Sequence, residues 1–550
     1  MSTQRWSTMK KKLTEIVESY RRFNEKVYEP FTGKQRVGVL LCNVMLSLYI
    51  TLIFILHGFD ERVVLVLLQG PLFFFTTYQG FKVFLLKQNK LHISCNKERG
   101  KLSWKVFGVV SSIVFVIFTL NLLANYPGGI TPDNIDQWQQ VQSRNFYNWH
   151  PAIHTMIIWL ITRVFQVYSF FIGFQILTFS FVSGYMAATL AAWGIKKRWL
   201  ILFLITIISP ISTRNIMLYA WKDTFFTILL LCIATYMINI VLSDGKWLLK
   251  WNNVAAIAVI SALLIVRQNG FFFSLPLGIL IIVCYGRITR NAIYAVVASV
   301  LVILGITRVL YPLAEVTHPQ SQIYVESVGL PMTILSGVMA HYPDRLDNQT
   351  REFMNRMATD EEWRATFIRG SYNSVKWAFG TSQFVNEIPP RDLLLMTLRT
   401  IRRAPGASMS EVAALTRLVW NPLSWNVIWL HTSPNATGIV YSEYEIEAMQ
   451  FVISISKILY GFVSTVIDLL TPSVMLNSIG LHMLLLLLAG AYSVNRNLRS
   501  KALFLFIPSV VYNLGTMLLL SGPDFRLFHF NIVITLPLII ALLTKESRQN

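Results

Sequence analysis

Continuous apolar runs recur along this chain of 550 residues, from Val37 to the C-terminal tail. Each run is about twenty residues long, which is the length of helix that crosses the hydrocarbon core of a bilayer. Strands of a membrane β-barrel would alternate apolar and polar residues, and these runs do not. Charged residues make up 14% of the chain, against roughly a quarter in soluble domains. The sequence therefore predicts an all-α polytopic membrane protein.

Positive charge orients the predicted spans. The formal net charge is +20, and Lys and Arg gather in short segments between the apolar runs, as is typical of cytoplasmic loops. About twelve spans are predicted by hydropathy, at 37–57, 62–86, 106–124, 168–193, 199–214, 221–242, 252–267, 270–286, 291–311, 473–494, 502–521 and 528–544. Both termini then lie inside, together with the basic segments at 87–105, 196–198, 246–250, 287–290, 496–501 and 545–548.

Four regions follow from this map. We expect a basic amphipathic N-terminus at 1–36 and a bundle at 37–311 that contains the exported loop 125–168. A mostly helical exported loop domain with a surface helix is expected at 312–472, and the last spans with a short tail at 473–550. Two further apolar stretches, 151–165 and 451–470, would turn every basic loop between them outward if both crossed the membrane. The charge rule therefore predicts that both lie along, or dip into, the outer surface.

The first exported loop holds two acidic candidates for catalysis. Thr131 followed by Pro132 predicts a helix that begins at the membrane exit, with Thr131 as its N-cap. Asp133 then falls in the first turn and Asp136 lies on the same face, because residues three apart are neighbours on a helix. Acids in a first turn also simply stabilise the helix dipole, which is the structural alternative.

His150 and His154 have the i, i+4 spacing of a zinc pair. Pro151 is expected at the first helical position, which would leave His150 outside the helix as a cap, and no glutamate of an HExxH motif lies between the two histidines. We therefore predict no metal site here. The expected roles are binding of substrate hydroxyl groups or capping of a surface helix.

Three polar islands interrupt the apolar runs at predicted outer ends, and they contain Lys222, Asp223, Arg267, Asn269 and Arg526. Charges this close to hydrocarbon are costly and usually mark functional sites, although Lys and Arg at span ends can also extend to the interface without a function. The three cations are predicted at the same outer face as the acids of the first loop. That shared location favours a site.

Several of these segments resemble the GT-C superfamily of membrane glycosyltransferases, and more narrowly a bacterial branch of it. The resemblance rests on the segments Tyr126–Asp133, His150–Pro151, Trp221–Thr224, Arg267–Gly270 and Phe525–Arg526. It implies a GT-C-like helix arrangement, a bacterial plasma membrane, an active site that faces outside and a donor sugar carried on polyprenyl phosphate. This chain departs from its relatives at Leu527, where they usually have tyrosine, and its long exported loop matches no motif.

Transfer of a sugar from a lipid phosphate needs a base for the acceptor hydroxyl and cations for the departing phosphate. We therefore expect an inverting glycosyltransferase with Asp133 as general base and Asp136 assisting. Its predicted substrate-binding residues are His150, His154, Lys222, Asp223, Arg267, Asn269 and Arg526. The expected partners are the polyprenyl-phosphate sugar, a glycan or lipid-linked acceptor and membrane lipids, without nucleic acid, and a divalent cation is left open. A polysaccharide polymerase or ligase, and a transporter or lipid flippase without chemistry, are the alternatives.

Overall fold

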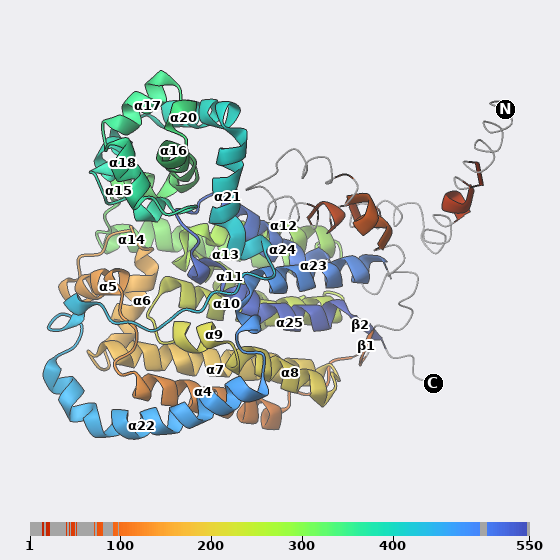
Figure 1. The fold of residues 1–550 in the computed structure, drawn as a ribbon. Helices are drawn as coiled ribbons and strands as arrows, with labels where there is room; N and C mark the ends of the chain where they lie inside the picture. The colour runs from red at the N-terminus through yellow and green to blue at the C-terminus, as the bar shows by residue number, and fades with distance from the viewer. Residues whose placement is uncertain are drawn as a thin grey trace.

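A computed structural model describes residues 92–96, 98–495 and 503–546, with short separate stretches between 14 and 80. The predicted spans at 37–57 and 62–86, and the predicted amphipathic N-terminus at 1–36, fall mostly outside the described residues. The described chain is almost entirely helical (Figure 1). Its two short strands are β1 (Ile93–Cys95) and β2 (Thr544–Glu546).

In the described part of the chain, seven helical segments are long and apolar enough to cross a membrane, which supports a polytopic membrane protein. They are α4 (Trp104–Ala124), α7 (Tyr168–Ala192), α10 (Lys222–Leu242), η3 with α12 (Gln268–Gly270 and Phe271–Tyr285), α13 to α14 (Asn291–Gly305 to Tyr311–Leu313), α22 (Glu443–Leu470), and η9 with α25 (Phe525–Phe528 and Phe530–Leu542). Shorter apolar helices are α6 (Ala152–Thr162), α11 with η2 (Trp251–Ala262 and Leu263–Val266), α23 (Ile479–Asn495) and α24 (Leu503–Met517). The count of about twelve spans, made from hydropathy, stays a prediction.

The predicted span 199–214 is two helices rather than one. α8 (Lys197–Ile208) ends at Ser209, and α9 (Ile211–Ile216) begins after Pro210. Pro210 has no backbone N–H to continue the hydrogen bonds of α8, and its own backbone is extended, so the two helices are separated there. This break leads the chain into the segment 217–221, which precedes the first turn of α10.

Helix α10 lies in the middle of the bundle, where it contacts α7, α11, α24 and α25 (Figure 1). Nearly all its residues are buried, and they belong to the main apolar core. Neighbours on every side hold α10 in place. Its first turn, with Lys222 and Asp223, is therefore a fixed point at one end of the bundle.

Several basic segments meet at the other end of the bundle. Strand β1 pairs in parallel with β2, and the Asn96 amide donates to the Trp193 carbonyl at 2.9 Å. These contacts join the region after the second predicted span, the end of α7 just before the basic residues 196–198, and the C-terminal tail (Figure 1). The arrangement agrees with the prediction that these basic segments share one side of the membrane.

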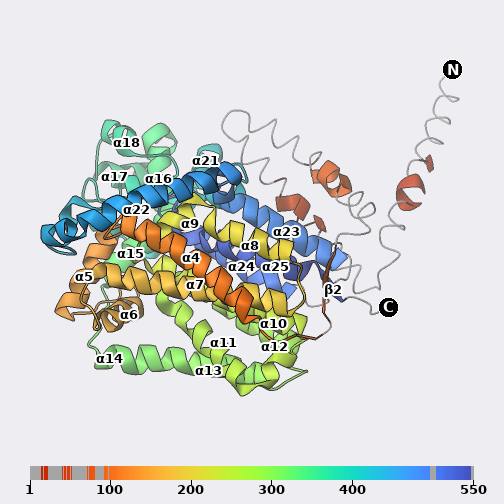
Figure 2. The same cartoon turned by 90° about the horizontal axis from the view of Figure 1, so that it is seen from below.

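Helix α22 lies beside α4 (Figure 2). Beside the two ends of α22, Gln142 of α5 (Pro132–Ser143) donates to the Ile439 carbonyl at 3.2 Å, and Thr471 contacts Ser209 at the end of α8. Helix α22 is one of the seven segments long and apolar enough to cross a membrane, so the outer-surface helix over 451–470 stays a prediction. The 11 residues of α6 are short for a span, as expected for 151–165.

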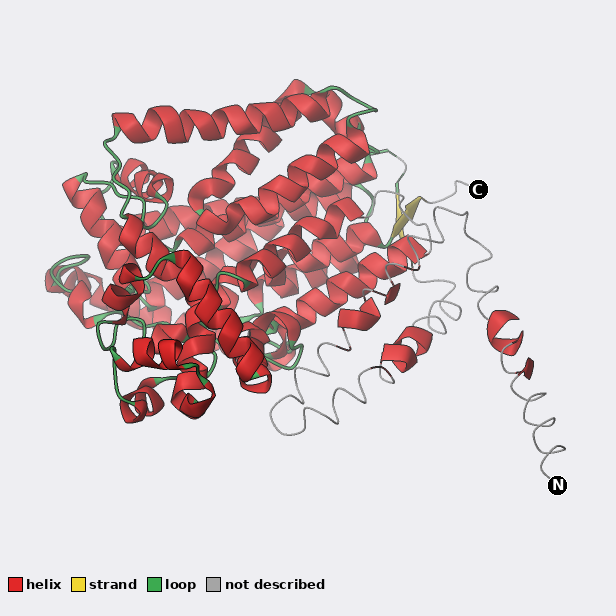
Figure 3. Ribbon diagram, turned by 90° about the horizontal axis from the view of Figure 1, so that it is seen from above, coloured by secondary structure: helices red, strands yellow, loops and turns green. Residues whose placement is uncertain are grey.

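A group of helices with its own core packs against the bundle near α5 (Figures 1 and 3). We call residues 320–403 the cap domain; it contains α15 (Gln320–Ser327), α16 (Gly329–His341), α17 (Asn348–Asn355), α18 (Asp360–Thr366), α19 (Thr381–Glu387) and α20 (Pro390–Arg403). Buried side chains such as Met332, Leu335 and Trp363 form its core. Helix α21 (Pro405–Trp420) leads back to α23. The cap domain is helical and covers part of the region 312–472, for which a mostly helical exported loop domain is predicted; the export of this region stays a prediction.

Candidate functional site

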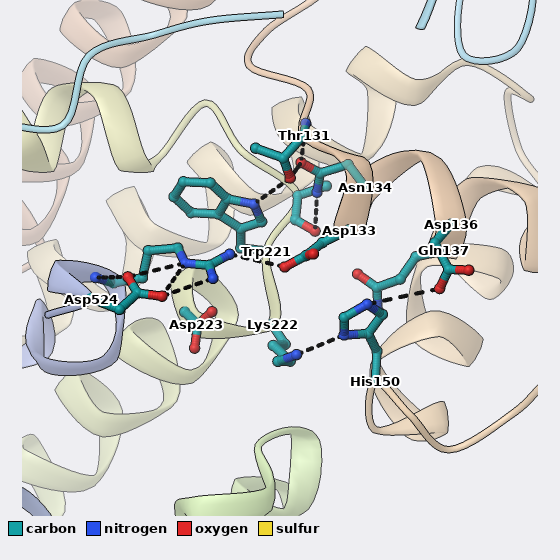
Figure 4. A network of polar contacts seen from close by, with 12 residues as sticks. Thr131, Asp133, Asn134, Asp136, Gln137, His150, Trp221, Lys222, Asp223 and Asp524 are labelled. Carbon is teal, nitrogen blue, oxygen red and sulfur yellow. Dashed lines mark hydrogen bonds and ion pairs between the residues drawn. The ribbon is translucent and has the colours of Figure 1, made fainter. Parts of the chain in front are cut away.

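A cavity of about 490 Å³ lies between the bundle and the cap domain. Its walls come from α5, the segment before α6, the start of α10, the η2–η3 turn, η9 and the cap domain. Of the nine site residues predicted from sequence, seven line it: Asp133, His150, Lys222, Asp223, Arg267, Asn269 and Arg526. The other two, Asp136 and His154, lie behind the cavity wall. Figure 4 shows how the polar side chains of α5 and α10 face one another.

Helix α5 begins at Pro132 with Thr131 as its N-cap, as the sequence predicts. The Asn134 side chain accepts hydrogen bonds from the Thr131 amide at 3.0 Å and hydroxyl at 2.8 Å, and it donates to the Ala220 carbonyl at 3.1 Å. The Trp221 indole also donates to the Thr131 hydroxyl at 3.0 Å (Figure 4). These bonds fix the first turn of α5 against the start of α10, so Asp133 points into the cavity.

Gly128 supplies the turn that leads into α5. Its φ of +110° lies in the region that favours glycine, and a Cβ there would come within 2.7 Å of the Leu218 carbonyl oxygen. The next residue's amide, on Gly129, donates to that same carbonyl at 3.0 Å. The close backbone approach therefore ties the turn to the segment before α10.

Arg526 joins two carboxylates across the cavity. Its Nη1 lies 3.0 Å from Asp133 Oδ2, while Nε and Nη2 lie 2.9 and 2.8 Å from Asp524 Oδ2. The guanidinium also sits over the Trp221 ring, 4.8 Å from its centroid, within the range of a cation–π contact. Asp524 caps η9 by accepting from the Arg526 amide at 3.0 Å. These contacts hold the guanidinium in place, with Nη1 directed at Asp133 and its central carbon over the Trp221 ring.

Burial of the Asp133 carboxyl acts to raise its pKa, but the nearby charges of Arg526 and Lys222 and the hydrogen bond from Arg526 outweigh burial. The pKa of Asp133 is held well below its usual range, so the side chain is a carboxylate. A carboxylate paired with a guanidinium is a weak base. It becomes a stronger one only when Arg526 takes another anionic partner.

Lys222 contacts an imidazole rather than an acid. Its ammonium donates to His150 Nδ1 at 2.7 Å, and no carboxylate of the described residues lies within ion-pair distance of it. Since Nδ1 accepts, the proton of the neutral ring must be on Nε2, which lies 3.8 Å from Asp136 Oδ2 (Figure 4). Burial and the Lys222 charge lower the pKa of His150, which favours that neutral form.

Asp136 is held on the far side of His150 from Lys222. Its carboxylate accepts from the Tyr147 hydroxyl and from Gln140 Nε2 at 3.0 Å. Burial raises the pKa of Asp136, although both hydrogen bonds lower it. Because Asp136 does not line the cavity, the structure favours an orienting role for it through His150 over direct contact with substrate.

His154 is fully buried, and the structure does not bring it to the cavity. Its Nδ1 lies 3.1 Å from Gln137 Nε2, and its ring packs edge-on against Phe171. The predicted contact between His154 and substrate is therefore corrected: the imidazole is a buried packing group. The expectation that Pro151 opens α6 as its first residue is also wrong by one position, because Pro151 is the N-cap and α6 begins at Ala152.

Arg267 and Asp223 form a buried ion pair at the base of the cavity. Asn269 lies two residues further along in η3, and Gln268 donates to the Trp149 carbonyl at 3.0 Å. The pair brings together the first and second polar islands of the sequence. Part of the Arg267 charge is thus already balanced by Asp223.

Sequence reasoning missed several residues of the cavity, namely Trp149, Gln268, Glu326, Asn373, Lys376 and Asp524. Asp524 lies in the same polar island as Arg526, so it could have been chosen. Glu326 and Lys376 lie in the long loop that matches no motif, about fifty residues apart, and nothing in the sequence relates them. Among the described residues, no three His, Cys, Asp or Glu side chains are grouped as metal ligands.

No protein-family model, curated protein or solved structure matches this chain.

Proposed function

We propose that this protein is an inverting membrane glycosyltransferase. It would move a sugar from a polyprenyl-phosphate carrier to a glycan or lipid-linked acceptor on the outer face of a bacterial plasma membrane. The observation that carries the proposal is that segments far apart in the sequence bring the Asp133 carboxylate and the cations of Lys222, Arg267 and Arg526 to a single cavity at one end of the bundle, which Asp223 and Asp524 also line. A base and a group of cations are what the transfer needs.

Lys222 and Arg526 are the residues that would hold the donor phosphate. Lys222 donates to a neutral imidazole rather than to a carboxylate, so its ammonium is available to an anion. The Arg526 guanidinium can present two parallel N–H groups to phosphate oxygens. Arg267 is paired with Asp223 and would contribute at longer range.

In the proposed step, the acceptor hydroxyl oxygen forms a bond to the anomeric carbon while the bond from that carbon to the carrier phosphate oxygen breaks. The phosphate leaves with the electron pair, and Asp133 takes the hydroxyl proton. The incoming phosphate would compete with Asp133 for Arg526 Nη1, while Asp524 keeps Nε and Nη2. Donor binding would therefore free Asp133 from its ion pair and make it a stronger base.

An apolar cavity of about 350 Å³ gives a path for the isoprenoid tail. It lies between α11, α12 and α13 and is lined by aliphatic side chains such as Ile257, Leu275 and Val296. Phe271 lines both this cavity and the polar one. A lipid whose headgroup lies near Arg526 could thus place its first isoprene units against Phe271 and the rest along α12.

The experiment is to incubate purified protein with a panel of radiolabelled polyprenyl-phosphate sugars, and with cell-envelope glycans and lipids as acceptors, and to follow release of the free carrier phosphate with and without a chelator. Release from at least one donor, dependent on the protein, is the expected result. A complete panel without release would contradict the proposal and favour transport of a lipid without chemistry. The chelator arm decides whether a divalent cation is required.

A further inference from the structure

The cap domain supplies one wall of the polar cavity, through Ile323, Glu326, Ser327, Asn373 and Lys376. This wall faces the cations of the bundle. Its polar side chains are an acid paired with an amine, Glu326 with Lys376, together with the amide of Asn373 and the hydroxyl of Ser327.

The wall is anchored to the segment that carries Arg526. The backbone amide of Asn373 donates to the Ser521 backbone carbonyl at 2.8 Å, and the Ser521 hydroxyl donates to the backbone carbonyl of Glu326 at 3.2 Å. A Cβ on Gly329 would come within 2.3 Å of the Leu520 carbonyl oxygen, so the two backbones are in direct contact. The cap domain is therefore held directly against the segment that carries Arg526.

Lys376 and Glu326 form the polar centre of this wall. The Lys376 ammonium is buried and lies 2.6 Å from Glu326 Oε1, and the Glu326 side chain is 36% exposed. An ammonium can only donate and a carboxylate can only accept, so the pair matches two neighbouring hydroxyl groups, one accepting and one donating. Asn373 and Ser327 add groups that both donate and accept.

The charged groups of the wall determine whether it favours an anionic ligand or an uncharged one. A phosphate brought to this side would meet the Glu326 carboxylate, and the Lys376 ammonium beside it is already paired with that carboxylate, so the pair has no net charge with which to attract a phosphate. A sugar without charge needs no such attraction. Trp149 adds an aromatic surface to the same cavity, against which the apolar side of a sugar ring can pack.

We infer that the cap-domain wall is the acceptor site, and that Glu326 and Lys376 bind adjacent hydroxyl groups of an uncharged sugar. The inference rests on the proposed function only for calling that sugar the acceptor. It also assigns the two walls different ligands, with phosphate at Lys222 and Arg526 and hydroxyl groups at the cap domain.

The binding test uses saturation-transfer difference NMR on the full-length protein in nanodiscs, with a panel of methyl pyranosides as probes and glycerol 1-phosphate as the anionic probe. At least one pyranoside should receive saturation from the protein, and Glu326→Gln should weaken that binding at least tenfold. Glycerol 1-phosphate binding should be weakened by Arg526→Lys and changed less than twofold by Glu326→Gln. The matched control is Arg356→Met, which removes an exposed ion pair with Glu387 on the same domain.

If Glu326→Gln fails to fold, Lys376→Met/Glu326→Gln removes both charges and leaves no buried ion unpaired, and it should show the same loss. Absence of any pyranoside signal, or equal binding in the wild type and the folded Glu326 variant, overturns the inference. Carrier release by the wild type is measured separately. Its failure would refute the transferase reaction, whereas failure of pyranoside binding alone would refute only the acceptor site.

Discussion

Two aspartates three residues apart in α5 have different surroundings. Asp133 faces the cavity and an arginine, whereas Asp136 faces a tyrosine, a glutamine and the edge of an imidazole. The sequence placed both on one face of a helix and could not separate their roles. The separation comes from two residues that follow α5 in the loop before α6: His150, which lines the cavity in front of Asp136, and Tyr147, which donates to the Asp136 carboxylate.

Arg526→Lys tests whether the geometry of the guanidinium matters. Lysine keeps the charge but cannot bind Asp524 through Nε and Nη2 while presenting Nη1 to a second anion. Hydrogen bonds to charged groups contribute about 1.5–3 kcal/mol each, so turnover should fall by on the order of tenfold or more. A donor titration on detergent-stable protein measures this loss in both turnover and donor affinity. Unchanged values for both would remove Arg526 from the site.

His154 makes the stability of the folded protein depend on pH. Burial, with a smaller contribution from the Lys222 charge, lowers its pKa to about 3 from an ordinary 6.5. Below pH 6.5 the His154 imidazole is protonated in the unfolded chain and stays neutral in the folded protein. The free energy of unfolding therefore decreases progressively as the pH falls from 6.5 toward 3. The melting temperature of His154→Gln should fall less steeply between pH 7 and pH 5 than that of the wild type. Parallel slopes in a thermal shift series would show that the imidazole titrates normally.

The elements near the site were partly predictable. Thr131 followed by Pro132 fixed the start of α5, because proline suits the first turn and a threonine cap suits the position before it. The break between α8 and α9 was missed, although Pro210 was visible, because the hydropathy of 199–214 is continuous across it. The contact of Glu326 with Lys376 could not be predicted, since it depends on how the cap domain packs rather than on any local pattern.

Gly329, at the start of α16, tests the attachment of the cap domain to the Arg526 segment. A methyl group there would collide with the backbone carbonyl of Leu520, which cannot rotate away as a side chain would. Gly329→Ala should destabilise the protein by about 1–3 kcal/mol, the usual cost of overpacking. Gly305→Ala is the matched control, because no atom lies within 4 Å of its added Cβ. Equal melting temperatures for the two variants would argue against the close contact.

The molecule has two chemically different ends. One end joins β1, β2 and the end of α7, and the other carries the cavity and the cap domain (Figure 1). Charge counting predicted this division, since it depends only on where Lys and Arg occur along the chain. Which end faces outside, and whether α22 crosses the membrane, depends on the bilayer and on how the chain is inserted.

Thiol labelling in intact cells determines the orientation. In a background without native cysteines, new cysteines at Ser143 and Asp344 should react with an impermeant reagent, because both positions are exposed at the cavity end. A cysteine at Lys246, also exposed, should react only after the membrane is permeabilised. Labelling of the Lys246 position from outside would overturn the predicted orientation. The native Cys95 is a poor reporter because its thiol is buried.

The most direct measurement is the rate of carrier release by Asp133→Asn beside the wild type and Asp136→Asn, each with the best donor of the panel. The amide keeps the shape of Asp133 but cannot take a proton, so turnover should fall by about two to four decades. Donor affinity should be kept or raised, because the amide has no charge with which to compete with the donor phosphate for Arg526 Nη1. Asp136→Asn should lose less, because Asp136 acts through His150. Turnover of Asp133→Asn within a few-fold of the wild type would contradict the role of Asp133 as base and leave it as a helix-start acid paired with Arg526.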